Sequence, residues 1–262
     1  MKPLVIVTRK LPASVELRMK ELFNVRLNGD DKVFTKEDLI AAVKEAHVLV
    51  TTVTDEISGG VLSKAAPDLK MIANYGVGVD HIDLMSARDK RIIITNTPGV
   101  LTEDTADMAM LLILGITRRM SEGEKMLRAG KWKIWSPIGM LGMRLRDKNL
   151  GIIGMGRIGQ ALALRAKTFG LNIHYYNRQQ INEDLEKSLC ATYWASLDQM
   201  ITQMNIISLN CSSTPDTHHI MSRRRIGLMQ KNAYLINTTR GDVVDEDALI
   251  EALEEKTIAG AG

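Results

Sequence analysis

Short apolar segments alternate along the chain with longer segments in which apolar residues recur every three or four positions. This alternation is typical of parallel α/β sheets, whose buried strands are connected by helices. Thr35, with two acidic residues close behind it, predicts the capped start of one such helix. In the first hundred residues the pattern predicts strands at 5–8, 48–51, 69–73 and 92–95, and helices at 14–23, 36–45 and 58–65.

The alternation resumes after the dipeptide Pro98–Gly99, which is the best domain boundary. An N-cap at Thr102 predicts one long helix that runs to Ala129, followed by an aromatic loop. The pattern then predicts strands at 150–153, 172–176, 206–209 and 233–237, helices at 158–169, 196–201 and 245–255, and the opening of one more strand at 258–261. We therefore expect an α/β protein with two doubly wound parallel-sheet domains, residues 1–97 and 98–262.

Composition narrows the class of protein. The 262 residues are 45% hydrophobic, enough for sizeable cores, and the net charge is +3. The absence of a basic stripe with interleaved aromatic residues disfavours nucleic-acid binding, and no apolar run reaches the roughly 20 residues of a membrane helix. The polar start of the chain does not fit a signal peptide. Cys190 and Cys211 form neither a disulfide framework nor a metal pattern, so we expect a cytoplasmic protein with no metal site.

A glycine-rich turn organises the second domain. Gly154, Gly156 and Gly159 fit G-x-G-x-x-G, the dinucleotide-binding pattern, between an expected strand and an expected helix. Gly154 permits a sharp turn, Gly156 lets the backbone approach a pyrophosphate, and Gly159 lets the helix pack close to the strand. Free N–H groups at the helix start favour an anion there. The pattern in this context predicts a nucleotide site; the alternative is a purely structural turn.

The end of the expected strand 172–176 bears on the choice of cofactor. An NAD site usually carries an acidic residue about 20 positions after the glycine pattern, where it binds the ribose hydroxyls. Here Asn177 and Arg178 stand near that place. Asparagine tolerates a 2′-phosphate and arginine attracts it, which favours NADPH over NADH. The alternative is that Arg178 is a solvated loop cation.

A second loop with candidate chemistry follows the expected strand 233–237, where ligands of open α/β sheets bind. It contains Arg240, whose planar guanidinium can hold a carboxylate and polarise a neighbouring carbonyl. The alternative is a structural arginine paired with Asp242 or Asp245.

A third loop, residues 74–80, follows a strand of the first domain. Its glycines expose amides that can form an anion-binding concavity. The alternative is an ordinary strand-to-helix turn.

These segments, in this order, resemble those of the D-isomer-specific 2-hydroxyacid dehydrogenases and, more narrowly, the glyoxylate/hydroxypyruvate reductase branch. The resemblance covers essentially the whole chain and is carried by residues 73–83, 96–107, 154–159 and 237–241. It implies a flavodoxin-like substrate domain, a Rossmann domain that binds NADP or NAD, and a cleft between them for a small 2-oxo acid. It also implies a homodimer built on the long helix and the loop 132–137, where an aromatic side chain reaches the partner's site; the alternative for Trp132 and Trp135 is local packing.

The resemblance implies roles for individual residues. The amides of Val77 and Gly78 would hold the substrate carboxylate, and Arg240, the catalytic cation, its carboxylate or carbonyl. Thr105 would lie beside the nicotinamide. The remaining cofactor contacts would be Arg157 and Ile158 at the pyrophosphate, together with Gly154, Gly156, Gly159, Asn177, Arg178 and Thr238.

The reaction requires a proton donor as well as a cation, because hydride transfer to a ketone carbon leaves an alkoxide. In the family this donor is a histidine backed by a glutamate, and the resemblance places both downstream of the segment that matches 258–262. We therefore expect a fragment of a longer reductase or a shortened chain with impaired catalysis and exposed sheet edges. None of the five histidines lies in the matching place: His47, His81, His174, His218 and His219. His81 fits a turn histidine, and His218–His219 predict the start of a surface helix.

Three functions are compatible with the sequence. The first is a reductase of small 2-oxo acids whose catalysis is damaged in this chain. The second is a non-catalytic, dinucleotide-responsive partner protein, as corepressor relatives in the same superfamily suggest. The third is a shortened chain that folds poorly and has no function of its own. Consumption of NADPH in the presence of glyoxylate distinguishes the first from the second.

Overall fold

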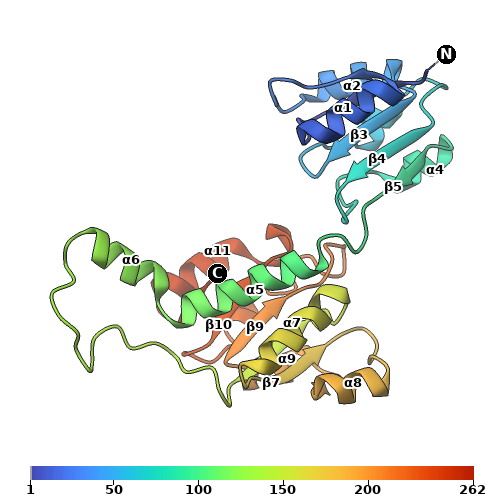
Figure 1. The fold of residues 1–262 in the computed structure, drawn as a ribbon. Coiled ribbons are helices and arrows are strands. Elements are labelled where there is room, and N and C mark those ends of the chain that lie inside the picture. Colours follow the sequence, from blue (N-terminus) through green and yellow to red (C-terminus); the bar gives the residue numbers. More distant parts are fainter. Residues whose placement is uncertain (1) are drawn as a thin grey trace. The chain divides into compact units, whose positions relative to one another are not determined.

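The chain divides into two compact units, Met1–Val100 and Leu101–Gly262, which we call unit 1 and unit 2. The computed structural model describes residues 2–262. Both units are drawn in Figure 1, where unit 1 occupies the blue to teal part of the ribbon. Every strand pair in both sheets is parallel, which confirms the expected fold class of two doubly wound parallel sheets.

Unit 1 has a five-stranded sheet of order β2-β1-β3-β4-β5, the flavodoxin-like order. Its strands are β1 (Leu4–Val7), β2 (Asn24–Arg26), β3 (Val48–Thr52), β4 (Met71–Tyr75) and β5 (Ile93–Thr95). Its helices are α1 (Ala13–Leu22), α2 (Lys36–Glu45), α3 (Gly59–Leu62) and α4 (Leu84–Asp89). Thr35 caps α2 as predicted, in a reciprocal box with Asp38.

Helices cover both faces of this sheet because successive side chains of a strand point to opposite faces. Along β1, Val5 and Val7 pack with Met19 of α1. Ile6 faces the other way and packs in a cluster with Leu39 of α2 and with buried residues of α3 and α4. The carboxyl ends of the strands, with the loops that follow them, therefore form one accessible edge.

Unit 2 has a six-stranded sheet of order β11-β10-β9-β6-β7-β8. This is the Rossmann order: from β6 in the centre, β7 and β8 follow on one side and β9, β10 and β11 on the other. The strand order therefore reverses between β6 and β9. Its strands are β6 (Asn149–Ile153), β7 (Asn172–Tyr176), β8 (Ala191–Tyr193), β9 (Ile206–Leu209), β10 (Tyr234–Asn237) and β11 (Gly260–Ala261). Its helices are α5 (Thr102–Thr117), α6 (Met120–Arg128), α7 (Arg157–Thr168), α8 (Glu183–Leu189), α9 (Leu197–Gln203), α10 (Arg223–Ile226) and α11 (Glu246–Glu254).

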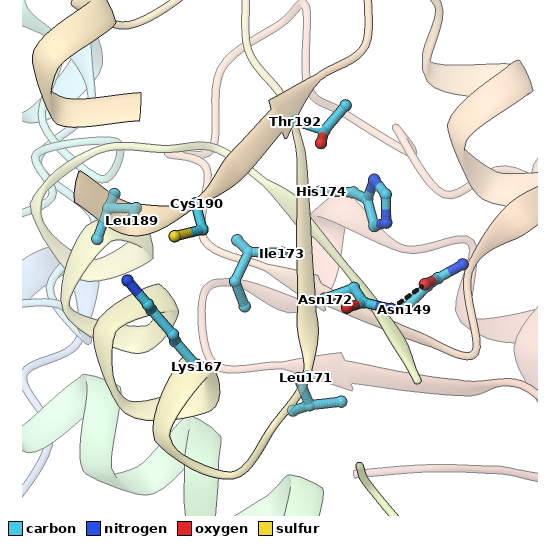
Figure 2. Close-up of a pocket in the computed structure, with 9 residues that line it drawn as sticks. All are labelled: Asn149, Lys167, Leu171, Asn172, Ile173, His174, Leu189, Cys190 and Thr192. Atoms are coloured by element: carbon cyan, nitrogen blue, oxygen red, sulfur yellow. Dashed lines mark hydrogen bonds between the residues drawn. The ribbon is translucent and has the colours of Figure 1, made fainter. Parts of the chain in front are cut away.

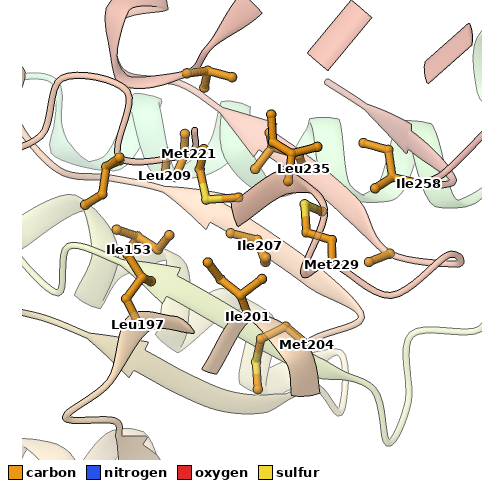
Figure 3. Packing of buried hydrophobic residues seen from close by; sticks show 14 of the residues in the cluster. Ile153, Leu197, Ile201, Met204, Ile207, Leu209, Met221, Met229, Leu235 and Ile258 are labelled. Carbon is orange, nitrogen blue, oxygen red and sulfur yellow. The ribbon is translucent and has the colours of Figure 1, made fainter. Parts of the chain in front are cut away.

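Two hydrophobic layers enclose this second sheet. On one face, side chains from β6, β9 and β10 pack against α9 and α11, as Figure 3 shows for Ile153, Ile207 and Leu235 beside Leu197 and Ile201. On the other face, α5 and α7 contribute alanine, leucine, isoleucine and methionine side chains to a second buried cluster. Because both faces are covered, ligands have access to the sheet at its carboxyl edge.

The structure corrects the expectation of one long helix from Thr102 to Ala129. Leu101, not Thr102, is the N-cap of α5, and the helix ends at Thr117; Arg119, with φ of 56°, separates it from α6. The Thr117 carbonyl accepts a hydrogen bond from the Met143 N–H at 2.8 Å. In a longer helix this carbonyl would instead accept from a residue of the next turn. The break therefore depends on a contact between residues distant in sequence.

The prediction of a surface helix beginning at His218–His219 is wrong. Both residues lie in a turn, and α10 begins only at Arg223. The His219 N–H donates to the Asp242 carbonyl at 2.8 Å, and the Met221 N–H donates to the Val243 carbonyl at 3.1 Å. These bonds hold the segment as an extended bridge against the loop after β10, which prevents an earlier helix start.

Candidate functional site

The glycine turn after β6 lies where the strand order reverses, the position at which doubly wound sheets bind ligands. Gly154 has φ of +99°, and a β-carbon on it would lie 2.7 Å from the backbone nitrogen of Cys211 after β9. A β-carbon on Gly159 would overlap the Gly154 carbonyl oxygen. Glycine is therefore required at both positions by backbone geometry, as the pattern predicted for the sharp turn and the close helix packing.

The start of α7 leaves backbone donors available. Its N-cap, Gly156, provides no side chain to accept from the first turn, and nothing lies within 4 Å of the place where its β-carbon would be. Arg157 is exposed and Ile158 half-buried. Uncapped N–H groups with the positive end of a helix dipole suit a phosphate group.

The other four predicted cofactor residues lie just after the carboxyl ends of strands or near the start of a helix in unit 2. Asn177 follows β7, and its amide nitrogen donates to the Gln179 carbonyl at 3.1 Å, while the neighbouring Arg178 is exposed. Thr105 lies half-buried in the first turns of α5. Thr238 follows β10, and its hydroxyl oxygen is buried without a hydrogen-bond partner among residues 2–262. A buried hydroxyl that lacks a partner costs free energy unless a ligand or water satisfies it.

Arg240 lies in the loop after β10, a strand that pairs with β9, itself the neighbour of β6. This loop is braced by Asn237: its amide nitrogen donates to the Arg240 carbonyl at 2.8 Å, and its amide oxygen accepts from the Thr239 N–H at 2.9 Å. The sequence reasoning named Asn237 only as part of a motif, and its role as a brace was missed. An asparagine at the last position of a strand is the signal that could have indicated it.

The two carboxylates that the sequence offered as structural partners of Arg240 also have other roles. Asp242 accepts from the Ser213 hydroxyl at 2.5 Å. Asp245 is the N-cap of α11 and accepts from the Ala248 N–H at 3.1 Å, and this bond lowers the pKa of its carboxyl. Each carboxylate therefore has a structural role that does not involve Arg240.

In unit 1 the predicted loop 74–80 begins with the last two residues of β4 and continues into the turn that follows. Asn74 is almost fully buried, and its amide nitrogen donates to the carbonyls of Gly76 at 3.1 Å and Gly78 at 2.9 Å. The Val77 carbonyl accepts from the Asn96 amide nitrogen at 2.9 Å. Loop carbonyls are thus tied to the body of unit 1.

Two backbone amides of the same loop, in contrast to its carbonyls, are not tied to the body of unit 1. Within residues 2–100, neither Val77 nor Gly78 donates its N–H to any hydrogen bond, and Val77 is exposed. In a trans peptide the N–H points away from the carbonyl of the preceding residue. Tying the Gly76 and Val77 carbonyls therefore turns the N–H groups of Val77 and Gly78 to the opposite side, where they can bind an anion.

The five histidines do not form one cluster. His47 precedes β3, and its Nδ1 accepts from the Leu4 N–H at 3.0 Å. His81 contacts Asn74, and His218 and His219 stack with ring centroids 4.0 Å apart. In β7, the Nδ1 of His174 accepts from the Trp194 indole at 3.2 Å, and burial lowers the pKa of this histidine.

A hollow of about 380 Å³ in unit 2 lies away from all the predicted site residues. Figure 2 shows that it is formed where β6, β7 and β8 begin, the edge of the sheet opposite the glycine turn. Its polar lining is largely self-satisfied: the Asn172 amide donates to Asn149 at 3.1 Å, and Lys167 donates to the Ser188 carbonyl at 3.0 Å. It is lined by Asn149, Lys167, Leu171, Asn172, Ile173, His174, Leu189, Cys190 and Thr192.

Large apolar side chains are exposed along α5, α6 and the loop that follows α6. Trp135 is 73% exposed and Ile138 is 82% exposed. Large exposed apolar side chains that gather on one surface often mark an interaction site. The exposed residues are Met108, Leu111, Met120, Leu127, Trp132, Ile134, Trp135, Ile138 and Leu141.

The described part of the chain has no helix that is both long enough and apolar enough to cross a membrane. Among residues 2–262, no three or more His, Cys, Asp or Glu side chains are grouped so that they could hold a metal ion.

Comparison with known proteins gives a consistent set of relatives. Residues 110–262 match the family described as D-isomer specific 2-hydroxyacid dehydrogenase, NAD binding domain. The glyoxylate reductase of Thermococcus litoralis is 43% identical, over 100% of this chain and 80% of that protein. The glycerate dehydrogenase of Hyphomicrobium methylovorum is 37% identical, over 100% of this chain and 81% of its own length. The crystal structure of the TT0316 protein from Thermus thermophilus superposes with a TM-score of 0.89 at 40% identity, covering 99% of this chain and 80% of that one.

Proposed function

Because the chain belongs to the D-isomer-specific 2-hydroxyacid dehydrogenase family, we propose that it reduces glyoxylate or hydroxypyruvate to the D-2-hydroxy acid. Membership confirms the resemblance found in the sequence. Relatives named glyoxylate reductase and glycerate dehydrogenase identify the chain as an NAD(P)-dependent enzyme of 2-oxo acid reduction. The choice of substrate within this class is our proposal.

The residues at the carboxyl edge of unit 2 fit a nicotinamide dinucleotide. The uncapped start of α7 suits the pyrophosphate, and the open space at Gly156 allows close approach of the backbone. The unpartnered hydroxyl of Thr238 is available to a bound cofactor. When bound, the reduced nicotinamide supplies the hydride; we propose that Thr105 lies near its ring.

The observation that carries the proposal is the placement of Arg240 on the same sheet edge as the glycine turn. An alkoxide develops on the substrate as the carbonyl is reduced. A fixed guanidinium that meets this charge stabilises the transition state more than the ground state. Asn237 keeps the Arg240 backbone in place, so that little reorganisation is needed during the reaction.

The substrate carboxylate is assigned to the amides of Val77 and Gly78. Their N–H groups make no hydrogen bonds within residues 2–100, and the carbonyls that precede them are tied elsewhere. Backbone amides bind a carboxylate without adding a titratable group to the site.

We propose that proton donation limits turnover in these 262 residues. None of the five histidines stands in the place that the family resemblance gives to the proton donor. Loss of a general acid typically lowers the rate by about a hundredfold to ten-thousandfold. Added imidazole, an external acid, is therefore expected to increase the rate of glyoxylate reduction; a rate that does not depend on imidazole would contradict this proposal.

Cofactor preference is assigned to NADPH. Arg178 is exposed at the end of β7, next to Asn177, where neither side chain repels a 2′-phosphate. A lower Michaelis constant for NADPH than for NADH is expected. A clear preference for NADH would refute the assignment.

We also propose a homodimer and a cytoplasmic location. The exposed apolar side chains along α5, α6 and the loop 131–141 support the dimer, because association would remove them from water. Cys190 and Cys211 are both free, as is usual in a reducing compartment. Sedimentation of the chain with Trp135→Ser tests the dimer, which the variant should weaken.

Replacing Arg240 tests the proposed function directly. Arg240→Ala should lower kcat for glyoxylate about a hundredfold to a thousandfold, because a cation that faces the developing alkoxide is lost. The dissociation constant of NADPH, measured by fluorescence titration, should stay within about twofold. Arg223→Ala, which removes an exposed arginine paired with Glu251, is the matched control and should leave both values unchanged.

Each result of this experiment decides between functions. Loss of NADPH binding in Arg240→Ala would make Arg240 a structural residue. NADPH binding without any turnover of glyoxylate or hydroxypyruvate in the unaltered chain, with or without imidazole, would support the non-catalytic partner protein instead.

A further inference from the structure

We propose that His81, acting through Asn74, is a positioning residue for the substrate carboxylate. The inference rests on the proposed function, in which the amides of the loop 74–80 bind that carboxylate. In this proposal His81 is not the proton donor, and both His81 and the buried Asn74 side chain help to orient the loop. The geometry behind it lies entirely within unit 1.

The orientation of the Asn74 amide follows from its neighbours. One end of the amide lies 3.1 Å from the Gly76 carbonyl oxygen and 2.9 Å from the Gly78 carbonyl oxygen. Carbonyl oxygens only accept hydrogen bonds, so this end must be the NH₂ group. The amide oxygen then faces His81 Nε2 at 3.0 Å. Because that oxygen is an acceptor, His81 must carry a proton on Nε2.

The two carbonyls therefore set the orientation of the amide, and the bond from His81 Nε2 to the amide oxygen adds to its stability. With the opposite orientation, the amide oxygen would face the carbonyls of Gly76 and Gly78, and both bonds would be lost. Asn74 is only 3% exposed, so water cannot easily replace these partners. The histidine thus stabilises the orientation in which Asn74 holds the loop.

Holding the Gly76 carbonyl orients the first of the two anion-binding amides. Among the described residues all peptide bonds are trans, so a carbonyl that points inward sets the following N–H outward. Asn74 orients the N–H of Val77 in this way, through the Gly76 carbonyl, which also accepts from the Thr97 N–H at 3.0 Å. The N–H of Gly78 is oriented independently, because its preceding carbonyl, that of Val77, is held by Asn96.

The backbone of His81 is itself fixed, which makes the ring a dependable donor. The Ile57 N–H donates to the His81 carbonyl at 2.8 Å, and the Asp83 N–H donates to the Ile57 carbonyl at 2.9 Å. The adjoining Ile82 is buried in the core of unit 1. The ring therefore projects from an anchored segment onto the loop.

The test compares His81→Ala with His81→Gln in the full chain. Glutamine can place an amide N–H near the position of Nε2, whereas alanine provides no donor. His81→Ala should raise the KM for glyoxylate about tenfold with little change in kcat, because a carboxylate contact is made equally in the ground and transition states. His81→Gln should remain within about threefold of the unaltered chain in both constants.

His47→Ala is the matched control. It removes the same kind of side chain from unit 1, together with one hydrogen bond, from the Leu4 N–H. That bond lies at the start of β3, whereas the bond between His81 and Asn74 lies at the carboxyl end of β4. The KM for glyoxylate should not change in this variant. Equal effects of His47→Ala and His81→Ala would overturn the proposal, as would equal effects of His81→Ala and His81→Gln.

A second readout separates this inference from the proposed function. The amide chemical shift of Val77, measured by NMR without substrate, should change in His81→Ala, because the peptide before it is held by Asn74. The amide chemical shift of Gly78 should stay the same, because the peptide before it is held by Asn96. If Val77 changes and Gly78 does not, but the chain does not turn over glyoxylate, His81 still positions the loop. The proposed binding of a substrate carboxylate by the loop would then be refuted. An unchanged amide chemical shift of Val77 would overturn the positioning role whatever the turnover.

Discussion

The glycine turn 154–159 and the loop 74–80 expose backbone amides by different means. In the glycine turn, the backbone shape itself does so: a β-carbon would lie 2.7 Å from a neighbouring nitrogen at Gly154 and would overlap a carbonyl at Gly159. In the loop 74–80, a buried asparagine side chain ties the carbonyls inward. The glycine turn therefore requires that residues 154 and 159 have no β-carbon, whereas the loop 74–80 depends on the polar atoms of Asn74.

The difference has a consequence for mutation. A turn that depends on empty space is damaged by adding one methyl group, whereas a loop that depends on a buried brace is damaged by removing polar atoms. The loop after β10 belongs to the second kind, since Asn237 braces Arg240 as Asn74 braces Gly76 and Gly78. The glycine turn is therefore tested by adding a methyl group, and the two asparagine-braced loops are tested by removing polar atoms.

The largest effect is expected for Gly159→Ala. The added methyl group would overlap the Gly154 carbonyl, so α7 must move away from β6, at a cost of about 3 kcal/mol or more in the free energy of unfolding. Urea denaturation followed by tryptophan fluorescence measures this loss, because all three tryptophans, Trp132, Trp135 and Trp194, lie in unit 2. Gly156→Ala is the control: its methyl group meets open space, so stability should change by less than about 1 kcal/mol. Equal losses in the two variants would contradict the requirement for empty space at Gly159.

The next effect is expected for Asn74→Ala. The variant leaves the Gly78 carbonyl without its donor and removes the acceptor of His81, which should cost about 2 kcal/mol in the free energy of unfolding. Because Asn74 belongs to unit 1, circular dichroism should report the loss while the tryptophan fluorescence transition of unit 2 stays in place. An unchanged circular dichroism transition would show that the amide brace is not needed for stability.

The smallest effect concerns acid, to which the two units should respond in different pH ranges. In unit 2, burial lowers the pKa of His174 below the ordinary value of 6.5. The unfolded chain therefore binds a proton before the folded chain does, and stability is lost as pH falls from 6.5 towards the lowered pKa. Protonation of Nδ1 would also break the bond from Trp194, so the fluorescence of that residue should change in the same range. His174→Gln should remove the dependence, and a His174→Gln chain that still titrates there would contradict it.

Unit 1 provides the contrast. Hydrogen bonds from Arg9 lower the pKa of Asp31 to about 2. This pair contributes stability above the ordinary pKa of an aspartate, about 3.8, which is lost only as pH falls towards 2. Both groups are at the surface, so the contribution should be small and should shrink in high salt.

Sequence patterns alone determined the elements and the backbone chemistry of the nucleotide turn. Strands 172–176 and 206–209 were predicted with the bounds that the structure shows, because apolar runs between turn residues specify buried strands. Short elements such as β2 and β8 were not predicted, since three residues carry little periodicity. The requirement for glycine at 154 and 159 was readable because it is a property of the local turn.

Contacts between residues distant in sequence could only be decided by the tertiary structure. The break between α5 and α6 depends on the Met143 N–H reaching the Thr117 carbonyl, and nothing in residues 102–129 signals it. The brace of Asn74 is likewise set by its neighbours: burial removes water, the Gly76 and Gly78 carbonyls fix the direction of its amide, and His81 contacts the amide oxygen. A side chain has many rotamers and partners in an unfolded chain, and only packing selects one of each.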